Sequence, residues 1–190
     1  MSNVAMAMKK APEIKSMIAG IYAISGAFGL NRYAYANATG DTPQSEWNVY
    51  VDPEAADIVY NSGVKLVALG LDVATHFDVN LTDGDIHMLE QSDKQEAKFF
   101  LQAIRFVNQR GFEAYCAVID CMAVGYAIDP ELVTTITGRV GIETKDGLTL
   151  GMTVLDSRHH FVWETLPEVE IGESADYEGF LKLLMKLVLA

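Results

Sequence analysis

The stretch DPEAADIVYNSGVKLVALGLDV, residues 52–73, predicts a helix followed by a buried strand. Asp52 offers a side chain that can cap the start of a helix. Pro53 has no N–H, which costs nothing in the first helical turn because an N–H there has no partner within the helix. Gly63 marks the end of the helix. Residues 65–73 are apolar without alternation, which is typical of a strand covered on both faces. A helix that leads into such a strand is a unit of an α/β fold.

Helices and buried strands continue on both sides of this stretch. Residues 2–16 have apolar side chains at helical spacing, and residues 17–28 are mostly small and apolar, which predicts a helix and then another buried strand. Residues 92–111 carry the clearest apolar stripe of a helix, and they begin with the spacing of a capping box at Ser92.

The last third of the chain is richer in strands. From residue 134 to residue 169, β-branched side chains and turn signals predict a run of shorter strands, and residues 176–189 predict a closing amphipathic helix. We therefore expect a single domain over residues 1–190. Its fold class is α/β, with a mainly parallel sheet and helices on both faces.

The composition of the 190 residues limits the class of protein. Half of them are hydrophobic, 21% are charged and the formal net charge is −12, which fits a globular chain and excludes a disordered one. The negative charge would repel nucleic acid and anionic membranes, so we expect neither as a partner. The longest apolar run, residues 115–128, is interrupted by Asp120 and is shorter than the roughly 20 residues of a membrane span. The first residues lack the features of a secretory signal, which predicts a cytoplasmic location.

Polar residues interrupt the apolar sequence first at residues 37–48, NATGDTPQSEWN. Glu46 and Asn48 stand two positions apart, so in an extended segment their side chains would point to the same side. A carboxylate and an amide on one side suit the recognition of hydroxyl groups. A turn with incidental polar residues is the competing interpretation.

A second interruption is Asp120, within AVIDCMAVGYAIDP at residues 117–130. A carboxylate among apolar residues needs a partner, a metal ion or a helix N-terminus to accept its charge. Helix capping alone would explain it as well as a functional role does.

Four segments of the chain, taken in order, resemble one enzyme family. The segments are SNVAMAMKKAPEI at 2–14, SEWNVYVDPEAADIVYNSGVKLVALGLDVATH at 45–76, AVIDCMAVGYAIDPEL at 117–132 and GLTLGMTVLD at 147–156. They are similar to the inosine-uridine-preferring nucleoside hydrolases. The resemblance implies the fold of the C-terminal two-thirds of such an enzyme, and hydrolysis of the bond between ribose and a nucleobase by water held on calcium.

The resemblance also implies roles for particular residues. Asn37, Glu46 and Asn48 would bind ribose hydroxyls. Asp120 would be a calcium ligand, and the backbone carbonyl of Ser2 would be another, since a carbonyl does not depend on its side chain. Holding the ribose suits the chemistry, because positive charge develops on the sugar in the transition state.

The sequence departs from the family pattern in three places. The family's N-terminal strand ends in a cluster of aspartates that supplies the general base and most of the calcium charge, whereas Met1 of this sequence aligns after that strand. Ile119 occupies the position where many members carry a histidine that protonates the departing base. Asn31 competes with Asn37 for the role of ribose ligand, because the loop that contains both, residues 29–45, is longer than usual. We therefore assign no catalytic residue and expect this chain alone to bind no calcium.

Three hypotheses on function follow. The chain is a truncated nucleoside hydrolase with little or no activity by itself, or it becomes active with a separate chain that supplies the aspartates, or it is an inert ribose-binding or subunit-interface module. In each case the expected small-molecule partner is a ribonucleoside. Missing first strands would expose apolar surface and a sheet edge, which predicts self-association as a homo-oligomer.

Overall fold

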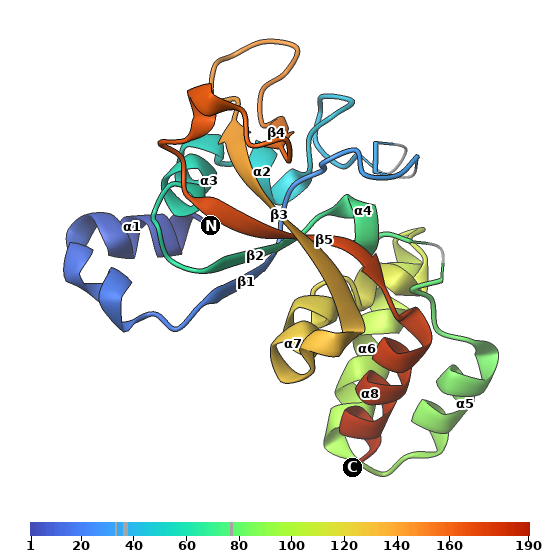
Figure 1. Cartoon of the computed structure of the whole chain (residues 1–190). Helices are drawn as coiled ribbons and strands as arrows, with labels where there is room; N and C mark the ends of the chain where they lie inside the picture. Colours follow the sequence, from blue (N-terminus) through green and yellow to red (C-terminus); the bar gives the residue numbers. More distant parts are fainter. Residues whose placement is uncertain (33, 36–37, 77) are drawn as a thin grey trace.

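A five-stranded sheet lies at the centre of the computed structural model, which describes residues 1–32, 34–35, 38–76 and 78–190 (Figure 1). The strands are β1 (Ile21–Ile24), β2 (Leu66–Leu69), β3 (Val133–Ile142), β4 (Thr153–Asp156) and β5 (Glu168–Ala175). Their order is β1-β2-β5-β3-β4. β1, β2 and β5 are parallel neighbours, whereas β3 is antiparallel to both β5 and β4. Four strands therefore run in one direction and β3 runs against them, and the expected α/β class is confirmed.

Helices cover both faces of the sheet (Figure 1). The α-helices are α1 (Ser2–Lys10), α2 (Trp47–Tyr50), α3 (Pro53–Tyr60), α4 (Leu71–Ala74), α5 (Asp83–Gln91), α6 (Gln95–Gln109), α7 (Cys121–Ile128) and α8 (Tyr177–Leu189). The 3-10 turns are η1 (Pro12–Met17), η2 (Ala114–Ala117), η3 (Pro130–Leu132) and η4 (Phe161–Trp163). None of the helices in the described ranges has both the length and the apolar character that crossing a bilayer demands.

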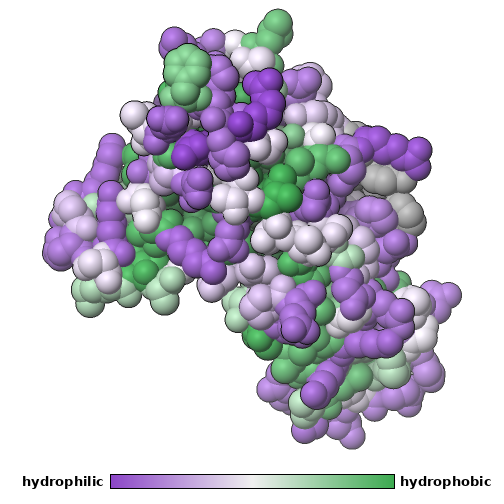
Figure 2. Space-filling view, viewed as in Figure 1, coloured by the Kyte–Doolittle hydropathy of each residue, from purple (hydrophilic) through white to green (hydrophobic). Residues whose placement is uncertain are grey.

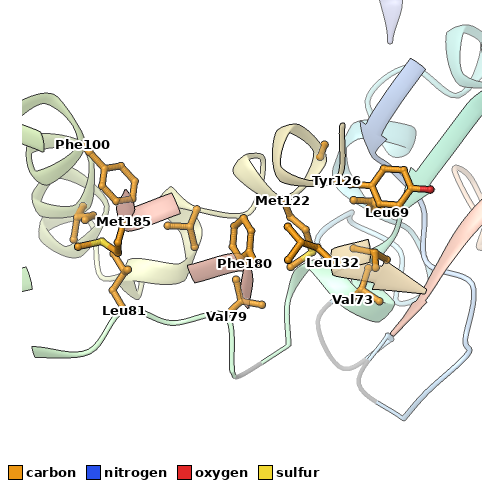
Figure 3. Packing of buried hydrophobic residues seen from close by; sticks show 14 of the residues in the cluster. Leu69, Val73, Val79, Leu81, Phe100, Met122, Tyr126, Leu132, Phe180 and Met185 are labelled. Carbon is orange, nitrogen blue, oxygen red and sulfur yellow. The ribbon is translucent and has the colours of Figure 1, made fainter. Parts of the chain in front are cut away.

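The strand β2 separates two hydrophobic cores. Leu66 and Ala68 pack with α1 and α3, whereas Val67 and Leu69 pack into the larger core beside α6, α7 and α8. Figure 3 shows this larger core, in which Phe180 and Met185 of α8 lie among side chains of the other helices. Because successive side chains of a strand point to opposite faces, a run without alternation is what a doubly covered strand requires.

Helix boundaries confirm most of the expected capping and correct one expectation. Asp52 caps α3 by accepting a hydrogen bond from the N–H of Ala55, at 3.1 Å. The capping box expected at Ser92 is wrong, since α6 begins after Lys94 without a side-chain cap. The capping box of the neighbouring helix α5 instead begins at Thr82, which has an aspartate three residues later.

The N-terminal helix and the first strand are shorter than the sequence predicts. α1 ends at Lys10, and Ala11 has φ −139° and ψ 75°, outside the helical region. Pro12 explains this end, because the residue before a proline is pushed out of the helical region. The strand expected over residues 17–28 is reduced to the four residues of β1, because the chain turns away after Ile24.

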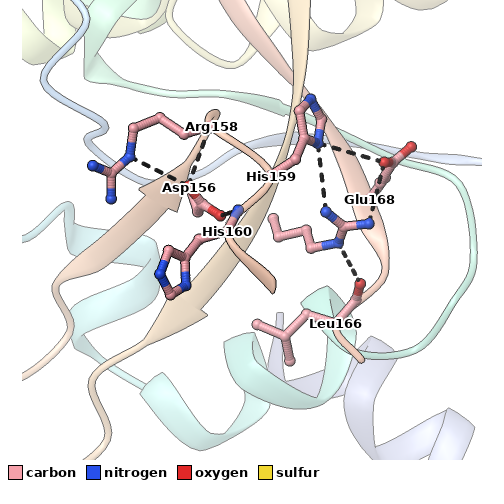
Figure 4. Close-up of polar contacts among 7 residues, drawn as sticks. Asp156, Arg158, His159, His160, Leu166 and Glu168 are labelled. Carbon is pink, nitrogen blue, oxygen red and sulfur yellow. Dashed lines mark hydrogen bonds and ion pairs between the residues drawn. The ribbon is translucent and has the colours of Figure 1, made fainter. Parts of the chain in front are cut away.

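The connection from β4 to β5 is fixed by charged side chains (Figure 4). The Asp156 carboxylate accepts hydrogen bonds from the backbone N–H groups of Arg158 and His160, at 3.0 and 2.5 Å. The guanidinium of Arg139, on β3, lies 3.5 Å from the Glu168 carboxylate at the start of β5. These contacts hold the turn against the sheet edge.

Candidate active site

A cavity of about 500 Å³ lies where β1 ends and α4 follows β2. In parallel sheets the carboxyl ends of the strands are the usual place for a ligand. The cavity is lined by Ile24, Thr39, Glu46, Trp47, Asn48, Leu71, Thr75, Phe112, Cys116, Ile119 and Asp120. Three residues singled out from the sequence, Glu46, Asn48 and Asp120, are therefore brought together, with Ile119 beside them.

Glu46 reaches the cavity as the N-cap of α2. Its Oε1 accepts a hydrogen bond from the N–H of Asn48 at 2.7 Å, and its Oε2 accepts from Val49 at 3.2 Å and from Gly26 at 3.1 Å. The residue is only 3% exposed. Burial raises the pKa of the Glu46 carboxyl, the three N–H donors oppose this rise, and the negative charge of Asp120 adds to it. With one donor among the described residues, Oε1 keeps a lone pair for a ligand hydroxyl.

Asn48 lies in the first turn of α2, so the extended segment expected for Glu46 and Asn48 is wrong. The two side chains still share the cavity, because the Glu46 carboxylate folds back over the helix start. Asn48 Nδ2 donates to the carbonyl oxygen of Ile24 at 3.0 Å. This bond fixes the amide at the carboxyl end of β1 and leaves Oδ1 as the acceptor that a ligand hydroxyl can use.

Asp120 immediately precedes α7 but makes no side-chain capping bond to it. Its side chain is exposed and borders the cavity, close enough to raise the pKa of the Glu46 carboxyl. Helix capping therefore does not account for Asp120 in this structure. Ile119 also borders the cavity, so the position that the resemblance gives to the acid for the leaving group carries an aliphatic side chain.

Ser2 does not line this cavity. Ser2 begins α1, and its hydroxyl donates to the Asp52 carboxylate, which holds the pKa of that carboxyl below its ordinary value. Asn37 lies outside the described residues. The competing Asn31 ties its loop to α4, since its Nδ2 donates to the carbonyl oxygen of Asp72 at 2.6 Å.

The side chains around Asp120 do not fit a calcium ion. Calcium takes about 6 to 8 oxygen ligands, several of them carboxylates. Over the ranges that the structure covers, no three His, Cys, Asp or Glu side chains come close enough together to hold a metal. Glu46 directs its oxygens to backbone N–H groups, and Ser2, whose backbone carbonyl the resemblance gives as a ligand, does not line the cavity.

Two buried residues beside the cavity, Asp72 and Thr153, were not predicted from motifs in the sequence. The Asp72 carboxylate, 1% exposed, accepts from the N–H groups of Phe28 at 2.8 Å and Leu30 at 2.7 Å. Thr153 Oγ1 accepts from the N–H of Ala27 at 3.0 Å. Together with Glu46 they fix the backbone that leaves β1. Asp72 has a sequence signal, because it is the one carboxylate in the apolar run from 66 to 74.

Comparisons with known proteins agree with this architecture. The family model "Inosine-uridine preferring nucleoside hydrolase" matches residues 1–182. The pyrimidine-specific ribonucleoside hydrolase RihA of Shigella boydii serotype 4 is 32% identical over 188 residues, covering 96% of this chain and 57% of the relative. Its namesake from Salmonella paratyphi C is 33% identical over 187 residues, with the same coverage.

Two solved structures share the fold. A plant nucleoside hydrolase superimposes with a TM-score of 0.77 at 25% identity, over 99% of this chain and 59% of its own. The purine-preferring ribonucleoside hydrolase of Gardnerella vaginalis superimposes with a TM-score of 0.76 at 29% identity, over 98% of this chain and 57% of its own. The 190 residues thus span less than two-thirds of the length of these relatives. With its family match running from residue 1 to residue 182, the chain belongs to the inosine-uridine preferring nucleoside hydrolase family.

Proposed function

We propose that this chain binds the ribose of a ribonucleoside in the cavity at the end of β1, and that its reaction is hydrolysis of the N-glycosidic bond. The observation that carries the proposal is the convergence of Glu46, Asn48 and Asp120 on one cavity at the carboxyl end of a parallel strand. The names of the relatives, which are hydrolases of pyrimidine or purine ribonucleosides, support the same chemistry. We also propose that residues 1–190 act as one unit, because both cores share β2.

The residues of the cavity divide the work of such a reaction. Glu46 Oε1 and Asn48 Oδ1 accept hydrogen bonds from ribose hydroxyls and so orient the sugar. As the C1′–N bond breaks and water adds at C1′, positive charge develops on the sugar, which the carboxylates of Glu46 and Asp120 stabilise. The bonding electrons leave with the base, and the water that adds at C1′ gives up one proton to solvent. Ile119 cannot donate a proton to that base, so solvent must supply it.

The 190-residue chain alone is expected to be impaired. Calcium is the ion that the family resemblance implies, and the side chains around Asp120 do not form a ligand set for it. Without an acid at residue 119, the departure of the base also loses the 10²- to 10⁴-fold or so that general acid catalysis typically contributes. Binding of a ribonucleoside without turnover is therefore the second candidate function. A separate chain that supplies acidic residues would convert such a binding protein into an active hydrolase.

Self-association and a cytoplasmic location remain parts of the proposal. An apolar cavity of about 130 Å³ opens between α7 and α8, bordered by exposed Val124 and Ile128, and Figure 2 shows hydrophobic surface in that region. Light scattering at micromolar concentration tests for an oligomer, and a monodisperse monomer would contradict it. The two free cysteines suit a reducing compartment.

Calorimetric titration with ribose tests the binding site directly. We expect weak binding that Glu46→Ala abolishes, because each hydroxyl hydrogen bond contributes on the order of 1 kcal/mol. Glu54→Ala is the matched control, since Glu54 is exposed in the first turn of α3. Equal affinity in the wild type and Glu46→Ala would contradict the site.

An assay of base release from inosine and uridine tests whether hydrolysis by this chain is impaired. Robust turnover that Asp120→Ala removes would overturn the proposed impairment.

A further inference from the structure

The charged side chains in the lining of the candidate cavity are both acidic. Glu46 and Asp120 border the cavity, and among the residues that the structure describes no Lys, Arg or His does so. The negative charge of Asp120 raises the pKa of the Glu46 carboxyl, so the two groups lie close enough to repel each other. The whole chain adds to this field, since its formal net charge is −12. A positively charged ligand would relieve the repulsion.

The same lining is poor in groups that could protonate a departing base. General acids in enzymes are most often His, and otherwise Glu, Asp, Lys, Tyr or Cys. Over the described part of the chain, the lining offers only the two carboxyl groups and the thiol of Cys116. Three N–H groups donate to Glu46 and favour its charged form, which has no proton to give. Ile119, directly before Asp120, is aliphatic. A neutral base would therefore need its proton from solvent.

We propose that this cavity selects ribonucleosides whose base is positively charged, such as an N-ribosylated pyridinium ring, and that these are the substrates that the chain hydrolyses. A base of this kind answers both features of the lining, because carboxylates attract it and it leaves without a proton. The inference rests on the proposed function, since the ribose must lie against Glu46 and Asn48 for the base to lie in the field of both carboxylates.

The reaction of such a substrate needs no acid. When the C1′–N bond breaks, both of its electrons pass to the ring nitrogen, and the pyridinium ring becomes a neutral pyridine. The oxygen of water forms the new bond to C1′, and that water gives one proton to solvent. The products are ribose, a neutral base and one proton. The 10²- to 10⁴-fold or so that a general acid typically contributes is therefore not missing from this reaction.

Two exposed aromatic side chains at the cavity also favour a cation. Trp47 is 50% exposed and Phe112 is 56% exposed, and both belong to the lining. The face of an aromatic ring attracts a positive charge, and the indole ring of Trp does so most strongly. This attraction is the same whichever ring lies nearer to the ligand, so it supports selection by charge.

Calorimetric titration with two matched ligands tests this selection. Nicotinamide riboside carries a pyridinium ring, and 3-(ribofuranosyl)benzamide is its neutral analogue, with carbon in place of the ring nitrogen. We expect the charged ligand to bind about 5- to 50-fold more tightly than the neutral one. Asp120→Asn should reduce this ratio by about threefold or more. Asp93→Asn is the matched control and should preserve the ratio, because Asp93 is fully exposed and lies outside the lining.

A rise in sodium chloride from about 0.05 to 0.5 M should also reduce the ratio, since salt screens the attraction between charges. This measurement uses the unmodified chain, so it does not depend on the folding of a variant. Thermal unfolding followed by circular dichroism verifies that Asp120→Asn and Asp93→Asn fold.

Base release tests the reaction itself. The chain should release nicotinamide from nicotinamide riboside faster than the uncatalysed reaction does, whereas uridine should release no measurable uracil. Release from neither substrate would overturn the proposed hydrolysis of charged nucleosides. Uracil release that Cys116→Ser removes would show that the thiol protonates the base, and the need for a charged base would then be wrong.

Titration with ribose separates this inference from the proposed function. If ribose binds, and the charged and neutral ligands bind with equal affinity, the selection by charge is wrong and the ribose site stands. If ribose and both ligands fail to bind, the proposed function fails and the inference fails with it. A ratio that neither Asp120→Asn nor salt reduces would show that the carboxylates are not its cause, and would also overturn the inference.

Discussion

The hydroxyl of Thr153 donates to the carbonyl of Ala27 at 2.7 Å and accepts from the N–H of the same residue at 3.0 Å, across 126 residues of sequence. One buried side chain on β4 thereby satisfies both backbone groups of a residue that has just left β1. The backbone around Ala27 borders the candidate active site, since Gly26 also donates to Glu46. The far edge of the sheet thus helps to shape the cavity.

Thr153→Val should destabilise the fold by about 2 to 4 kcal/mol, because a nearly isosteric side chain would leave the N–H and the carbonyl of Ala27 buried without a partner. Thr153→Ser is the matched control, since it keeps the hydroxyl and should cost clearly less. Urea unfolding followed by circular dichroism measures both variants. Equal stability of the two variants would show that the hydroxyl bonds contribute little.

Asp72→Asn should also lower the free energy of unfolding, by about 1 to 3 kcal/mol. The two carboxylate oxygens accept from Phe28 and Leu30, and an amide would turn one acceptor into a donor that faces an N–H. Asp83→Asn, on the exposed first turn of α5, is the comparison and should cost less than about 1 kcal/mol. The same urea assay measures both, and an unchanged midpoint for Asp72→Asn would contradict the expectation.

Glu46 should make stability depend on pH. Burial, as the largest effect, raises the pKa of its carboxyl above the ordinary value of 4.5, so the folded chain holds that proton more tightly than the unfolded chain does. Its contribution to the free energy of unfolding is therefore greatest below pH 4.5 and declines as pH rises from there through the raised pKa. Glu46→Gln cannot titrate. The free energy of unfolding of the wild type minus that of Glu46→Gln should be larger at about pH 4 than at about pH 7. A difference that does not change with pH would refute this expectation.

Calcium should leave the thermal stability of the isolated chain unchanged. A ligand that binds the folded state raises the melting temperature with its concentration, and the side chains around Asp120 supply too few oxygens for such binding. Differential scanning fluorimetry with millimolar calcium chloride measures this, with magnesium chloride as the ionic-strength control. A saturable rise that is specific to calcium and absent in Asp120→Ala would show that a calcium site is complete.

Local signals in the sequence predicted the helices and the central strand, because caps and apolar periodicity act over a few residues. Asp52 before Pro53 fixed the start of α3, and the unbroken apolar run predicted β2. The hydrogen bond from the N–H of Gly26 to Glu46 could not be predicted from such signals, since it depends on how the segment after β1 lies against α2. The direction of β3 was equally inaccessible, because it depends on the pairing of β3 with β4 and β5, which local patterns in the sequence do not specify.

The division of the β2 side chains between two cores has a consequence for how the chain comes apart. If the core beside α1 and α3 unfolds, Leu66 and Ala68 lose their packing contacts. If the larger core unfolds, Val67 and Leu69 lose theirs. Loss of either core therefore weakens the other, and the two should melt in a single cooperative transition. The amide protons of β2, paired with β1 and β5, should be among the last to exchange with deuterated solvent.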